Sequence, residues 1–126
     1  MYKRQVQRDL ALEAWEQAIA ATVIHYINDT LQDMADIGTA DYSFSNHAKH
    51  WSEMKGFALS MQFNRRSPLT VEQFGELHDM MGTAPVLEGG DLAGYQTDLI
   101  AARAMLGTAY GFDAALLGDD NGNDGW

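Results

Sequence analysis

The sequence predicts an all-α protein, a four-helix bundle or array with one long N-terminal helix. Apolar residues recur at three- and four-residue spacing in four segments, and no alternating strand pattern longer than a few residues occurs. The connections between these segments are short, which favours antiparallel neighbours. A chain of 126 residues fits one domain. We expect a helical domain over 1–112 and an acidic, flexible C-terminal tail over 113–126.

The first helix is expected from about Val6 to Ile37, because neither proline nor glycine interrupts its apolar stripe and Gly38 follows it. Trp15 belongs to that stripe and is therefore predicted to be core. The full stripe comprises Val6, Leu10, Trp15, Ile19, Val23, Ile27, Leu31 and Met34. This helix is roughly twice as long as the third, which suggests that one end packs on something outside the chain.

The second helix is expected from about Asn46 to Phe63. Ser45 or Asn46 can cap its first amides, and the chain must leave the helical conformation before Pro68. The side chains expected to face the core are Trp51, Met54, Phe57, Ala58 and Met61.

The last two helices have clear start signals. Thr70 and Gln73 form a capping box that opens the third helix, which Gly82 ends. A connection over 83–90 follows, and Asp91 caps the fourth helix. The apolar stripe of the fourth helix comprises Leu92, Tyr95, Leu99, Ala102, Leu106 and Ala109.

Composition excludes several classes of function. The absence of cysteine removes disulfide frameworks, thiolate nucleophiles and zinc ribbons. A formal net charge of −10 repels phosphate backbones and anionic lipid, so no nucleic-acid partner is expected. No apolar run is long enough for membrane insertion, and the N-terminus lacks the apolar centre of a signal peptide. The chain is therefore expected to be cytoplasmic if complete, or else a mature fragment.

Histidines on apolar helix faces are the best candidates for chemistry. On a helical wheel His47 and His50 share the arc of the second helix's apolar stripe, and His78 lies at the edge of the third helix's stripe. Neutral imidazoles in a bundle interior can bind a divalent metal such as iron or zinc. The predicted metal ligands are His47, His50 and Glu53, with His78 or Asp29 arriving from another helix. No catalytic residue is predicted.

The alternative interpretation is that each histidine packs at a helix interface with one nitrogen hydrogen-bonded. Glu53 follows Lys49 by four residues and could equally form an exposed ion pair. The zinc-protease spacing of two histidines four apart is absent, and so is the repeated Glu-x-x-His of di-iron bundles.

Residues 43–64, followed by 67–69 and 74–85, carry a resemblance to a family. They read SFSNHAKHWSEMKGFALSMQFN, SPL and FGELHDMMGTAP. With flanking sequence from about Ile24 to Phe112, they resemble imelysin-like, iron-regulated surface proteins of bacteria. The resemblance implies a helical protein of two bundles, located in the periplasm or at the cell surface. Its Gly-x-His-x-x-Glu motif, suspected of binding metal, is matched here from Ala48 to Glu53, with Ala48 in place of glycine. Members are longer, so the chain would be half of that fold.

Three functions follow as hypotheses. The first is a non-enzymatic metal- or ligand-binding module of the bacterial cell envelope. The second is a structural or interaction bundle that forms a homo-oligomer or packs on a missing partner domain. The third, a metal-dependent hydrolase, needs three convergent ligands and a general base, for which only His47, His50 and Glu53 can be named.

Overall fold

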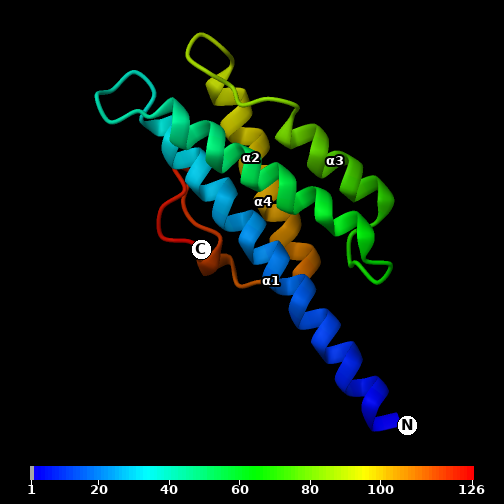
Figure 1. Ribbon diagram of the computed structural model, residues 1–126. Coiled ribbons are helices and arrows are strands. Elements are labelled where there is room, and N and C mark those ends of the chain that lie inside the picture. The colour runs from blue at the N-terminus through cyan, green and yellow to red at the C-terminus, as the bar shows by residue number, and fades with distance from the viewer. Residues whose placement is uncertain (1) are drawn as a thin grey trace.

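The computed structural model describes residues 2–126 and confirms an all-α bundle (Figure 1). The helices are α1 (Tyr2–Ala35), α2 (Phe44–Ser60), α3 (Val71–Met81) and α4 (Leu92–Tyr110). Two short 3₁₀ turns, η1 (Met61–Phe63) and η2 (Ala114–Leu116), follow α2 and α4. No strand occurs among the described residues. Around the bundle α1 contacts α2 and α4, and α3 contacts the same two helices from the other side.

Side-chain caps fix where three helices begin. Thr70 and Gln73 form the expected capping box, and the Asp91 carboxylate accepts from the Gly94 amide as predicted. The predicted start of the second helix is wrong by two residues, because Ser43 rather than Ser45 or Asn46 is the cap. The Ser43 hydroxyl accepts from the Asn46 amide, so α2 already begins at Phe44.

The core lies where the four helices meet. Trp51 joins three of them, because its indole N–H donates to the Tyr95 hydroxyl at 2.8 Å, and that hydroxyl donates to the Met81 carbonyl at 2.6 Å. Burial raises the pKa of Tyr95 to about 12, so its hydroxyl stays protonated as a donor. The fully buried side chains include Ile24, Ile27, Met54, Leu77, Leu99 and Leu106.

The N-terminal part of α1 projects beyond the bundle (Figure 1). Every described residue from Tyr2 to Trp15 is exposed, and Glu16 is the first buried one. The prediction that Trp15 lies in the core is therefore wrong, and Val6 and Leu10 of the predicted apolar stripe are exposed as well. Their spacing is helical, but the other helices do not extend far enough to cover them. Residues 2–15 are called the α1 projection below.

The C-terminal segment, predicted as a flexible tail over 113–126, lies against α1 and α4. The Asn28 side-chain amide donates to the carbonyls of Leu117 and Trp126, both at 3.0 Å. Its oxygen accepts from buried Arg103 at 2.7 Å. A side chain at Gly122 would collide with the Asn28 backbone, so glycine is what permits this approach. We call residues 117–126 the C-terminal strap.

Candidate functional site

His47 is fully buried on α2, as predicted, and its contacts are local. Its Nδ1 is 3.0 Å from the Tyr42 hydroxyl, and its Nε2 is buried without a hydrogen-bond partner. Burial lowers the pKa of His47, an effect only partly opposed by the charge of Asp33. The ring is therefore neutral near pH 7. In these respects it matches the interpretation of a histidine packed at a helix interface.

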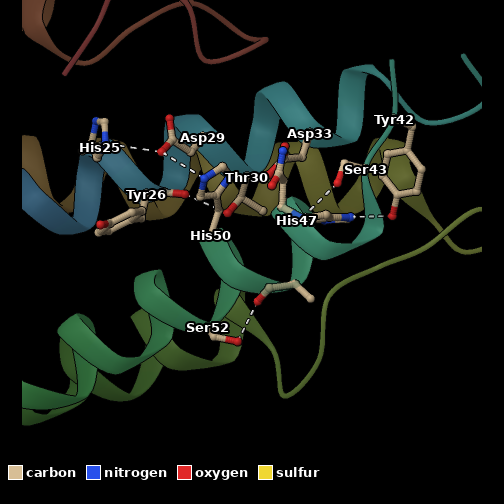
Figure 2. A network of polar contacts seen from close by, with 12 residues as sticks. His25, Tyr26, Asp29, Thr30, Asp33, Tyr42, Ser43, His47, His50 and Ser52 are labelled. Atoms are coloured by element: carbon tan, nitrogen blue, oxygen red, sulfur yellow. Dashed lines mark hydrogen bonds and ion pairs between the residues drawn. The ribbon is translucent and has the colours of Figure 1, made fainter. Parts of the chain in front are cut away.

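His50 lies between two carboxylates of α1 (Figure 2). Its Nδ1 is 2.6 Å from the Asp33 carboxylate, and its Nε2 is 3.7 Å from Asp29. The same Asp29 oxygen is 3.3 Å from Nε2 of His25. Because residues 25, 29 and 33 are four apart on α1, they present one row of side chains to α2. The result is a continuous chain of polar contacts, Asp33 to His50 to Asp29 to His25.

This chain constrains what His50 can bind. The two nitrogens of an imidazole point away from each other, and here each faces a different carboxylate. A single ion therefore cannot contact Asp29 and Asp33 together with His50 in this arrangement. Across residues 2–126 no three histidine, aspartate or glutamate side chains are grouped so that they could hold a metal ion.

Glu53 is half-buried on α2, one turn beyond His50. Its Oε2 is buried without a hydrogen-bond partner, and no ion pair with Lys49 forms among the described residues. Burial, and after it the negative charge of Glu53, raises the pKa of Tyr26. Glu53 therefore faces the α1 side of α2, close to Tyr26.

His78 is the member of the predicted set that belongs to a different interface. It lies on α3 against Phe74, with ring centroids 4.5 Å apart, and both ring nitrogens are buried without a partner. Its carbonyl accepts from the Lys55 ammonium at 3.1 Å. Burial and then the Lys55 charge lower the pKa of His78. No polar contact of its ring reaches His47, His50 or Glu53 among the described residues.

An apolar groove adjoins the histidine chain on the outer side of α1 and α2. It has a volume of about 380 Å³ and is lined from α1 by Trp15 and Ile19. Its α2 wall is formed by Glu53, Gly56, Phe57 and Ser60.

The groove and the histidine chain form one surface. Phe57 stacks on Tyr26 at 5.8 Å, and Tyr26 stacks on His50 at 6.3 Å. We call the surface from Trp15 to Asp33, together with the facing side of α2, the α1–α2 face. Helical periodicity assigned Trp15 and Phe57 to the core, but they are 71% and 41% exposed. A helical wheel shows which residues share a side of one helix. It does not show whether another helix covers that side.

A second cavity, of about 310 Å³, lies beside buried Glu16 at the base of the α1 projection. The Glu16 carboxylate accepts from the Tyr110 hydroxyl at 2.7 Å and from the Asn64 amide at 2.8 Å. Burial raises the pKa of Tyr110. These bonds join α1 to the end of α4 and to the loop after η1. Both carboxylate oxygens already have neutral donors, so the residues have a structural role.

No match to this chain was found among protein-family models, curated proteins or solved structures. The resemblance to imelysin-like proteins therefore stays a prediction that rests on residues 43–64, 67–69 and 74–85. None of the described helices has the length and apolar character needed to cross a membrane.

Proposed function

We propose that this chain is a non-enzymatic helical docking module that receives a helix of another polypeptide on its α1–α2 face. One observation carries the proposal: large apolar side chains lie uncovered at the groove of this face. Trp15 and Phe57, which line the groove from α1 and α2, are 71% and 41% exposed. Large exposed apolar side chains that adjoin one another are typical of protein interaction sites.

The surroundings of the α1 projection support the same conclusion. Most of the stability of helices in proteins comes from packing of an apolar side rather than from helix propensity. Arg66 bonds to Asp9 on the projection, but Tyr2, Val6 and Leu10 stay exposed. A partner that covers Trp15 and Phe57 would stabilise the projection and bury the groove at once. Docking of a helix into an apolar groove is a common mode of recognition.

The test is protection of Trp15 from oxidation. The chain would be labelled with hydroxyl radicals in cells that naturally produce it, and separately as dilute purified protein, with oxidation read by mass spectrometry. We expect Trp15 to be protected in cells, because the partner covers it. Phe63, which is 81% exposed and does not line the groove, serves as the internal control. Equal oxidation of Trp15 in both samples would contradict the proposal.

A second candidate function is cation binding by His50 in the bacterial cell envelope, as the resemblance implies. It is favoured by the 2.6 Å contact of His50 Nδ1 with Asp33, because a carboxylate on the remote nitrogen is how proteins orient metal-binding imidazoles. Side-chain rotation would have to bring further ligands to Nε2. Elemental analysis of untagged protein and zinc titration of wild type and His50→Ala test it. Negligible, equal heats would remove this candidate.

A further inference from the structure

The C-terminal strap contains Asn121, the only asparagine of the chain that a glycine follows. An asparagine side chain in this position can lose its nitrogen as ammonia, because the backbone nitrogen of the next residue attacks its Cγ atom. Glycine has no Cβ to hinder that attack and is the least restricted residue in conformation. Asn121 is exposed, whereas Gly122 is buried. One reacting group therefore lies in solvent and the other against the bundle.

The docked strap restrains the backbone of Gly122. Its amide nitrogen donates to the Asp119 carbonyl at 3.0 Å, and its carbonyl accepts from the Gln32 side-chain amide at 2.7 Å. A Cβ atom at position 122 would collide with the Asn28 carbonyl oxygen, so the backbone of Gly122 lies directly on α1. While these contacts hold, the Gly122 nitrogen is hydrogen-bonded and fixed in place, and it is not free to approach the Asn121 side chain.

The loop of the strap is held mainly by polar contacts. Of residues 119–125 only Gly122 is buried. The bonds of this stretch to α4 come from Arg103 and Gln96, which donate to backbone carbonyls at 2.9 Å and 2.7 Å. Segments with few buried apolar contacts open locally without unfolding of the whole domain. Such opening releases Gly122 from α1 and allows its turn to rearrange.

We infer that Asn121 is a deamidation site that the docked strap protects, and that its conversion to isoaspartate undocks the strap. Water or hydroxide takes the amide proton of Gly122, and the nitrogen bonds to Cγ of Asn121. The bond from Cγ to the side-chain nitrogen breaks, and that nitrogen takes a proton from water and leaves as ammonia. The product is a five-membered succinimide. Addition of water at its side-chain carbonyl gives aspartate, and addition at its backbone carbonyl gives isoaspartate.

Isoaspartate does not fit the docked strap, because its side-chain CH₂ becomes part of the main chain. The hydrogen bond from Gly122 to Asp119 closes a turn of fixed length, and Gly122 has no free space against Asn28. A longer main chain therefore moves Gly122 off α1 and breaks its bond with Gln32. Aspartate keeps the normal main chain and changes only an exposed side chain. None of residues 117–126 lines the groove of the α1–α2 face, so this site is separate from the proposed docking surface.

Peptide mapping by mass spectrometry, during incubation at mildly alkaline pH, tests the protection. The free peptide of residues 117–126 is the unprotected reference, and the folded chain should react at Asn121 at least about tenfold more slowly. Asn28→Ala removes two bonds to the strap and should speed the reaction by about tenfold. Asn64→Ala is the matched control, because Asn64 donates to Glu16 and not to the strap, and it should react like wild type. A folded chain that reacts as fast as the peptide would overturn the inference.

Gln32→Ala keeps the test decisive if Asn28→Ala does not fold. Gln32 is exposed, and the variant removes its bond to the Gly122 carbonyl. We expect the reaction to rise by about fivefold, the factor that corresponds to a net hydrogen bond of about 1 kcal/mol. Circular dichroism would confirm that each variant is folded. A rate equal to that of wild type in the folded variants would overturn protection by the strap.

Hydrogen exchange tests the undocking. The isoaspartate form, separated by chromatography from the unmodified chain, should exchange the amide hydrogens of residues 117–126 about tenfold faster or more. Asn121→Asp is the matched control, because it carries the same added charge on a normal main chain, and it should exchange like wild type. Equal exchange in the isoaspartate form and the unmodified chain would refute undocking. Equally fast exchange in Asn121→Asp would refute the lengthened main chain as its cause.

Discussion

The α1 projection and the rest of α1 have the same spacing of apolar residues, but only the rest of α1 is covered by other helices. Val6 and Leu10 in the projection recur at the same spacing as Ile24 and Ile27 in the bundle. The first pair is exposed and the second fully buried. Hydrophobic periodicity therefore establishes that a segment is helical and amphipathic. It does not establish whether the surface that covers the apolar side belongs to the same chain.

The largest expected difference between the two parts is in core stability. Ile24→Ala should lower the free energy of unfolding by about 2–5 kcal/mol, because it leaves a cavity in a fully packed site. Leu10→Ala is the matched control and should change it by less than about 0.5 kcal/mol, since Leu10 is exposed. Urea unfolding at low protein concentration measures both. A large loss for Leu10→Ala would show that the α1 projection packs within the monomer.

A smaller effect is expected where α1 meets the C-terminal strap. Asn28→Ala removes the donor to the Leu117 and Trp126 carbonyls and leaves the buried Arg103 guanidinium without its side-chain acceptor. Unsatisfied buried groups cost about 1–3 kcal/mol, so unfolding should become easier by that amount. Hydrogen exchange should rise in residues 117–126 in the same variant. Unchanged exchange there would mean that Asn28 does not hold the strap.

The third comparison uses pH to separate a buried histidine from an exposed one. Burial lowers the pKa of His47 below 6.5 in the folded chain, so the unfolded chain binds more protons as the pH falls. The stability that neutral His47 contributes is present above pH 6.5 and is lost as the pH falls below it. The loss between about pH 7.5 and about pH 5 should therefore shrink in His47→Gln, as measured by urea unfolding.

His25→Gln is the control for that measurement, because the His25 side chain is 49% exposed. It should leave the contribution of His47 to acid sensitivity in place. If His47→Gln and wild type lose equal stability over the same pH range, His47 does not cause the loss of stability at acid pH.

Local signals predicted much of the fold. Features that depend on spacing within one segment were predicted correctly. They include the capping box at Thr70, the cap at Asp91 and the burial of Met54 and Leu99. The start of α2 was misplaced because Ser43 and Ser45 are chemically equivalent caps two residues apart.

The candidate site was only partly predictable. Helical spacing placed His47 correctly in the interior, and the His25 to Asp29 spacing of four residues is visible in the sequence. The pairing of Asp33 with His50 depends on how α1 and α2 are aligned, which periodicity within either helix does not encode. His78 was grouped with His50 because both lie near apolar stripes, but α3 meets α2 elsewhere. Trp15 is exposed because no third helix lies over its side of α1, and the sequence of α1 alone does not show this.

The C-terminal strap has a consequence for how the chain is made. Asn28 and Arg103 leave the ribosome before residues 117–126, so their buried polar atoms have to wait for partners 89 and 98 positions downstream of Asn28. Contacts this distant in sequence form late, because closing a long loop costs entropy before any bond is gained. During synthesis the Asn28 amide therefore lacks these two partners until residues 117–126 have emerged, and the strap can close only after the four helices have been made.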